Sequence, residues 1–262
     1  MKKKILYLLM CIGLCLSACT NEVDEFTGNV HPQTRSASTA LNGNLASLFT
    51  GGAPTLTSAQ IKEVNDAYTK MTSINCYNNI DKAVRNKTSY NGTIFLDDQY
   101  GAAYFNKGSL AFPSYSILAS SMEHEFIHMY QRDVQGKQID TNKEKKDTGM
   151  MEFELAFYQG IIRYIHAGYS WIFQGEDGDP SYQSLWTSSL TDPSLIPQYE
   201  REFQIYVASI CTNGKPTSID IDEFIKWSNI FGEYSRGYSG KGLKFGNYNY
   251  GTSCINSLLR LY

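Results

Sequence analysis

Two histidines and a glutamate near the middle of the chain have the types and the spacing of a metal-dependent hydrolytic site. They lie in the pentapeptide His124-Glu125-Phe126-Ile127-His128. On a helix, side chains four residues apart lie on one face, one turn apart, so both imidazoles can bind one Zn²⁺ ion. Glu125 projects toward the same side, where it can take a proton from a water molecule on the metal. The motif therefore predicts a zinc site with Glu125 as the general base.

A third metal ligand has to come from another part of the chain, because a catalytic zinc has three protein ligands and one open position. Glu152 and Glu154 are the candidate carboxylates. They are two residues apart, so on a helix they point to nearly opposite sides, and only one can face the metal. His31 lies in a polar stretch and is expected to be solvated. His166 is 12 residues beyond Glu154, which on one helix is about 18 Å along the axis and out of reach of the same ion.

A small sheet is predicted before the motif. Residues 93–96 form a run of β-branched and apolar residues, which is typical of a strand. Residues 102–105 and 109–112 are similar runs on either side of residues 106–108, and this arrangement predicts a β-hairpin. Gly108 supplies the positive φ that such a turn needs.

The site residues are expected on two consecutive helices. The first is predicted over residues 115–132, with Ser114 as its N-cap, and it carries the motif. The second, over residues 148–167, carries the two candidate glutamates and ends at Gly168. Further helices are predicted from spacing and capping signals at residues 59–68 after a Ser58 cap, 80–84, 181–190, 197–210, 220–231 and 253–261.

This order of elements resembles the gluzincin metallopeptidases, and its compactness resembles the minigluzincins among them. The motif continues as Met129-Tyr130-Gln131, similar to an HExxHxYQ form in bacterial relatives whose glutamate helix often reads Glu-x-Glu-Ala. In those relatives the second glutamate is taken as the ligand. The resemblance therefore favours Glu154, with Glu152 as the alternate because Leu155 stands where the alanine would be.

The resemblance covers residues 93–167 and implies an α+β, zincin-like fold. That fold comprises a small mixed sheet with a hairpin edge, packed on the motif helix and the glutamate helix, and then a mostly helical C-terminal part. It also implies zinc-dependent peptide hydrolysis with one Zn²⁺ per chain and a peptide or protein as substrate. A monomer is expected. The metzincin branch is excluded, because Gln131 and Val134 stand where that pattern has glycine and histidine.

The N-terminal residues predict export and a lipid anchor. Three lysines precede an apolar run over residues 5–16, and the run ends in Leu16-Ser17-Ala18-Cys19, which resembles a bacterial lipobox. The alternative is an ordinary secretory signal. The lipobox implies a signal peptide over residues 1–18, a lipidated Cys19 with a flexible tether over residues 19–52, and one domain over residues 53–262.

A cell-envelope lipoprotein of the outer membrane follows from these features, on its periplasmic face or at the cell surface. The acidic residues Glu22, Asp24 and Glu25 look like the export signals of surface lipoproteins in Bacteroidota, although a solvated linker would have the same composition. The membrane is thus an expected partner through Cys19. The formal net charge of −3 leaves no basic stripe for nucleic acid.

A second hypothesis belongs to a different functional class. The chain could be a non-catalytic envelope or surface lipoprotein that uses a zincin-like fold to bind a protein or a glycan. A missing third ligand would favour this alternative. Cys76, Cys211 and Cys254 remain after Cys19, so at most one disulfide can form among them, and buried thiols are the simpler expectation.

Overall fold

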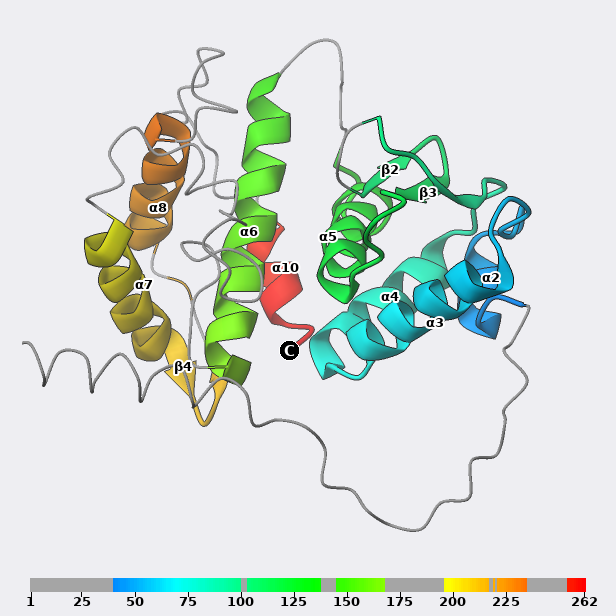
Figure 1. The fold of residues 1–262 in the computed structure, drawn as a ribbon. Helices are drawn as coiled ribbons and strands as arrows, with labels where there is room; N and C mark the ends of the chain where they lie inside the picture. Colours follow the sequence, from blue (N-terminus) through cyan, green and yellow to red (C-terminus); the bar gives the residue numbers. More distant parts are fainter. Residues whose placement is uncertain are drawn as a thin grey trace, which may run out of the picture. The chain divides into compact units, whose positions relative to one another are not determined.

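The computed structural model describes residues 40–99, 103–137, 145–167, 196–216, 219, 221–234 and 254–262. Within these ranges the chain has an α+β fold, with a small sheet and several helices (Figure 1). Cys19 and the helix expected over residues 181–190 lie outside the described residues. None of the described helices is both long enough and apolar enough to cross a bilayer.

The sheet before the motif is mixed and three-stranded, as expected. Its strands are β1 (Ile94–Leu96), β2 (Tyr104–Asn106) and β3 (Ser109–Phe112), in the order β1-β3-β2. β1 runs parallel to β3, whereas β2 and β3 form the predicted antiparallel hairpin. The hairpin turn has φ values of 48° at Lys107 and 81° at Gly108. This leaves β2 at the edge of the sheet.

Gly92 lies where two backbone segments approach closely. A Cβ atom on Gly92 would be 2.3 Å from the carbonyl oxygen of Gly108 and 2.3 Å from Oγ of Ser109. Neither neighbour is the end of a flexible side chain, because Gly108 belongs to the hairpin turn and Ser109 Oγ accepts the backbone N–H of Thr93 at 3.1 Å. The approach of the hairpin to the preceding loop therefore requires glycine here.

Gly92→Ala is expected to lower the free energy of unfolding by about 1–3 kcal/mol, the usual cost of an added methyl group in a packed site. Gly43→Ala is the matched control, because an added Cβ there has no neighbour within 4 Å. The control is expected to change stability by less than about 0.5 kcal/mol. Urea unfolding measures both, and equal midpoints for the two variants would show that the close approach has no energetic consequence.

Two longer helices before the sheet carry much of the core. α3 (Ser58–Thr72) begins where expected, but its N-cap is Thr57 rather than Ser58, since Thr57 and Gln60 form a reciprocal capping box. α4 (Asn75–Lys87) is longer than the helix expected over residues 80–84.

A folded segment precedes residue 53, where the domain was expected to begin. α2 (Gly43–Leu48) is capped by the side chain of Asn42. Leu45, Leu48 and Phe49 are buried in the core, and the backbone N–H of Tyr90 donates to the carbonyl of Leu48 at 2.7 Å. The few large apolar residues of this polar stretch are gathered at its end, at the spacing of one helix face, and that is enough to attach residues 42–52 to the domain.

The helix that carries the motif is α5 (Ala119–Met129), and it continues into a π-helical turn, η1 (Tyr130–Val134). It starts after residue 118 and not at 115, as the sequence suggested. Ser114 does not cap it, since its N–H and its hydroxyl group donate to the Asp98 carboxylate at 2.6 and 2.7 Å. A contact distant in sequence thus replaces the expected local cap.

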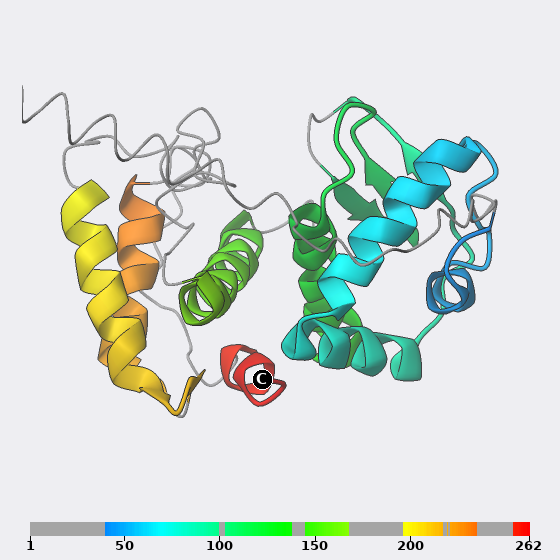
Figure 2. The ribbon, with the colours of Figure 1, turned by 60° about the horizontal axis from the view of Figure 1, so that its bottom comes forward.

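The described residues of the C-terminal part are mostly helical, as predicted. It contains α6 (Lys145–Ala167), α7 (Ile196–Ile210), α8 (Ile221–Tyr234) and the short α10 (Ile255–Leu259). A small hairpin of β4 (Cys211–Thr212) and β5 (Lys215–Pro216) was not anticipated. Figures 1 and 2 both show α10 beside α6, and the two helices contact each other.

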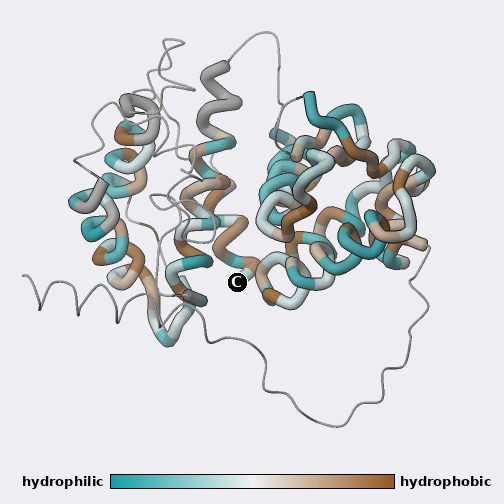
Figure 3. Tube along the Cα trace, in the orientation of Figure 1, coloured by the Kyte–Doolittle hydropathy of each residue, from teal (hydrophilic) through white to brown (hydrophobic). Residues whose placement is uncertain are grey.

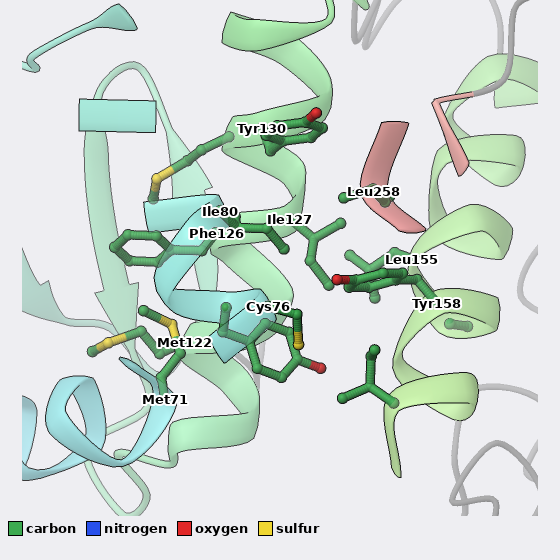
Figure 4. Close-up of a cluster of buried hydrophobic side chains, with 14 of the residues drawn as sticks. Met71, Cys76, Ile80, Met122, Phe126, Ile127, Tyr130, Leu155, Tyr158 and Leu258 are labelled. Atoms are coloured by element: carbon green, nitrogen blue, oxygen red, sulfur yellow. The ribbon is translucent and has the colours of Figure 1, made fainter. Parts of the chain in front are cut away.

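One cluster of buried apolar side chains extends from α3 and α4 through α5 to α6 and α10. Figure 4 shows part of it, with Phe126 of α5, Ile80 of α4 and Leu155 of α6. Apolar and polar residues alternate along α3, α4 and α8, as expected of helices with one buried face (Figure 3). Cys76, Cys211 and Cys254 are all free thiols.

Candidate metal centre

Three side chains from two helices meet at one point. α5 presents His124 and His128 on one face, and α6 brings Glu152 against them. The two Nε2 atoms are 3.1 Å apart, Nε2 of His128 is 3.2 Å from Oε1 of Glu152, and Nε2 of His124 is 3.5 Å from Oε2 of Glu152. These three residues form a group that could bind a metal ion.

The geometry reverses the order of preference between the two candidate carboxylates. Glu152 lies in the group, whereas Glu154 is directed to the side of α6 that carries α10. The Glu154 carboxylate accepts the backbone N–H of Cys254 at 3.3 Å, its thiol at 2.8 Å and the amide of Gln131 at 3.2 Å. Only one of the two glutamates faces the imidazoles, as expected from their spacing, and in this structure it is Glu152, so the geometry favours the alternate candidate over Glu154.

The spacing of the donor atoms can be compared with that of a tetrahedral zinc site. Zinc–ligand bonds of about 2.0–2.1 Å in a tetrahedral site place neighbouring ligand atoms about 3.3 Å apart. The two imidazole nitrogens, 3.1 Å apart, are close to that spacing, and each also lies near a different oxygen of Glu152, His128 at 3.2 Å from Oε1 and His124 at 3.5 Å from Oε2. Oε2 of Glu152 is buried and makes no hydrogen bond to any described part of the chain. A buried carboxylate oxygen of this kind is costly unless something satisfies it, and a cation would do so.

Charges within the group are strongly coupled. Burial alone would raise the pKa of Glu152, but the charge and hydrogen bond of His128 outweigh it and lower that pKa to about 2. Burial alone would lower the pKa of His128, but Glu152 raises it to about 9. For His124, burial dominates and lowers the pKa to about 4. At neutral pH, His128 and Glu152 are therefore an ion pair, and a cation bound there would displace a proton from His128.

Glu125 lies beside the group without belonging to it. Its Oε1 is 4.0 Å from Nε2 of His124, and its side chain is 6% exposed. Burial raises its pKa to about 8, although the nearby His128 and a hydrogen bond from the backbone of Phe105 oppose the rise. Phe105 belongs to the edge strand β2, so the sheet contributes directly to holding this carboxylate. A carboxyl group with a pKa near neutrality is suited to accept and return a proton.

Comparisons of the chain with protein-family models, with curated proteins and with solved structures find no match. The geometry of the residues is therefore what supports the site. His31 and Cys19 lie outside the described residues. His166 is near the exposed end of α6, where its Nε2 atom is 3.4 Å from the hydroxyl group of Tyr262.

Two further groups contact the site besides the ligands and the base that the sequence identified. The first is Gln131, which is fully buried and contacts Nδ1 of His128 at 2.9 Å. Its position three residues after His128 on one helix is the signal that could have identified it. The second is the backbone N–H of Phe105, which no side-chain motif reveals.

Proposed function

We propose that this chain is a zinc-dependent peptidase of the gluzincin kind, with His124, His128 and Glu152 as metal ligands and Glu125 as the general base. The observation that carries the proposal is the convergence of these three donors beside a separate buried carboxylate. Two histidines and a glutamate are a recurring ligand set of catalytic zinc, and structural zinc sites are usually closed by a fourth ligand, which is often cysteine. No described cysteine belongs to the group of three donors, and Cys254 instead donates its thiol to Glu154.

Another metal chemistry uses a similar donor set. Two histidines and one carboxylate also hold non-haem Fe(II) in oxygenases. Zinc is favoured here because the histidines come from HExxH on one helix, with Glu125 next to the first of them. Oxygen activation has no need of that adjacent carboxylate, whereas hydrolysis needs a base beside the attacking water.

The roles of the residues follow from their positions. Zinc bound at this site would act as a Lewis acid and would lower the pKa of a water molecule toward about 7. Glu125, a buried carboxyl group beside the three donors, can accept a proton from the attacking water when it is ionised and return it to the leaving amine, and a cation bound next to it would favour the ionised form.

The edge strand β2 is the element best placed to receive an extended substrate. It is paired with β3 on one side and contacts α5, which carries the motif. An extended peptide can add to such an edge through backbone hydrogen bonds, which bind peptides with little regard to side chains. In this proposal the lipid on Cys19 attaches the enzyme to the outer membrane.

Metal removal tests the proposal. The purified full chain is loaded with zinc, its metal content is measured, and it is incubated with a library of peptides whose products are identified by mass spectrometry. We expect about one zinc ion per chain, cleavage that stops when a chelator removes the metal, and recovery when zinc is added back. Peptides with acetylated N-termini distinguish internal cleavage from removal of N-terminal residues.

Two results would contradict the proposal. A chain that binds no zinc at saturating concentrations is not a zinc peptidase. A chain that binds zinc but cleaves no peptide in the library would favour the alternative, a non-catalytic envelope lipoprotein that binds a protein or a glycan.

A further inference from the structure

Gln131 connects the two helices of the metal centre. It is fully buried in η1, and its side-chain amide faces α5 on one side and α6 on the other. Oε1 is 2.9 Å from Nδ1 of His128, while Nε2 donates to the carbonyl oxygen of Met151 at 3.0 Å and to the Glu154 carboxylate at 3.2 Å. These three hydrogen bonds are directed at His128, at the residue before Glu152 and at Glu154.

The orientation of the amide follows from its partners. A backbone carbonyl can only accept a hydrogen bond, so the group that faces Met151 must be the NH₂ group. The amide oxygen must then face His128. Because that oxygen only accepts, Nδ1 of His128 must carry a proton and donate it. Nε2 is left as the atom directed at His124 and Glu152.

We propose that Gln131 is a positioning residue for the metal centre: it holds His128 in the tautomer and ring orientation that direct Nε2 at the ion, and Met151 and Glu154 hold Gln131. The inference rests on the proposed zinc site. Metal-binding histidines donate their second ring nitrogen to a carboxylate, a carbonyl group or water, and loss of such a partner typically lowers metal affinity about 10- to 100-fold. Here a glutamine fills that position.

The same network gives Glu154 a role. Its carboxylate is 1% exposed and bridges the Gln131 amide to the backbone N–H and the thiol of Cys254, just before α10. Burial raises the pKa of the Cys254 thiol, and the charge of Glu154 adds to this effect, so the thiol stays protonated as a donor. Cys254, 100 residues after Glu154 in the chain, is therefore connected to His128 through the side chains of Glu154 and Gln131.

Three substitutions in the full chain test the role of Gln131. Gln131→Met keeps the length and the apolar stem but removes every hydrogen bond. Gln131→Glu keeps an acceptor for His128 but loses the donor to Met151 and places a second carboxylate beside Glu154. Gln159→Met is the matched control, because Gln159 is a fully buried glutamine on α6 whose amide atoms make no hydrogen bond to the described residues.

Zinc affinity is measured by competition with a chromophoric chelator, and the visible spectrum of the cobalt-loaded protein reports the ligand geometry. We expect Gln131→Met to lower zinc affinity about 10- to 100-fold and to alter the cobalt spectrum. Gln159→Met is expected to leave both unchanged. Gln131→Glu is expected to bind zinc nearly as tightly as wild type, although the thermal stability of its metal-free form falls.

Gln131→Glu separates a positioning role from a packing role, because its zinc affinity is expected to stay near that of wild type while the stability of its metal-free form falls. If Gln131 only supports the fold, Gln131→Glu loses affinity and stability together, and the inference is wrong. Equal zinc affinity in wild type and Gln131→Met also overturns it, while leaving the proposed peptidase intact. If Gln131→Met does not fold, the zinc affinity and the stability of Gln131→Glu, each compared with wild type, decide between the two roles. A wild-type chain without zinc overturns the proposed function itself.

Discussion

Replacement of Glu125 by glutamine is expected to reduce peptide hydrolysis about a thousandfold, within the range of a lost general base. The substitution keeps the size of the side chain and an acceptor oxygen, but it removes the carboxylate that we propose takes the proton. Glu125 is not among the three clustered donors, so zinc is expected to remain bound at the wild-type stoichiometry. The measurements are initial rates on one cleaved peptide and metal content on the same samples.

Glu123→Gln is the matched control for this prediction. Glu123 lies two residues earlier on α5, is 2% exposed and forms an ion pair with Arg163 of α6 at 3.2 Å. Its replacement is expected to lower stability, since it weakens a largely buried ion pair, but to leave the rate within a few fold of wild type below the melting temperature. Comparable losses of activity in both variants would mean that the Glu125 effect comes from disturbance of α5 and not from the chemistry.

Zinc affinity is expected to depend strongly on Glu152 and weakly on Glu154. Glu152→Gln replaces a charged ligand beside both imidazoles. Its zinc affinity should fall by more than the factor of about 10 to 100 that is typical when a hydrogen-bond partner of a metal ligand is lost. Glu154→Gln leaves the three donors in place and is expected to cost at most about tenfold, mainly through its contact with Gln131. Chelator competition at fixed pH measures both variants on one scale.

The Glu152→Gln and Glu154→Gln variants also show which of the two glutamates is the third metal ligand. If Glu154→Gln abolishes binding and Glu152→Gln does not, then Glu154 is the ligand, and α6 must rotate when the metal binds. The metal-free stability of each variant serves as the control, because loss of the Cys254 contacts is expected to destabilise Glu154→Gln without removing a ligand.

The choice between Glu152 and Glu154 shows where the sequence ceases to be informative. The motif histidines could be placed from spacing alone, because positions four apart share a helix face. The rotation of α6 about its own axis could not be predicted from the sequence, because this helix is buried on several sides. Phe153 and Leu155 are as deeply buried as the residues of any other face, since α6 contacts α5, α7, α8 and α10. Because α6 has no polar face that would show which side turns to solvent, only the tertiary structure determines which glutamate lies against the histidines.

Local rules failed at two other places for a related reason. Ser114 was expected to cap the motif helix, but Asp98, 16 residues earlier, binds it instead. The polar stretch that ends at residue 52 was expected to be a tether, yet Leu45 and Phe49 bury its end in the core. In both cases a contact distant in sequence outweighs a local preference. The hairpin over β2 and β3 was predictable, because its turn chemistry and its pairing are both local.

The most direct test of the metal centre is a crystal structure of the zinc-loaded protein with anomalous data collected on both sides of the zinc absorption edge. We expect one strong anomalous peak about 2.0–2.2 Å from Nε2 of His124, Nε2 of His128 and a carboxylate oxygen of Glu152. Glu125 should lie close to the ion without binding it. An absent peak, or a peak coordinated by Glu154 in place of Glu152, would contradict the proposed site.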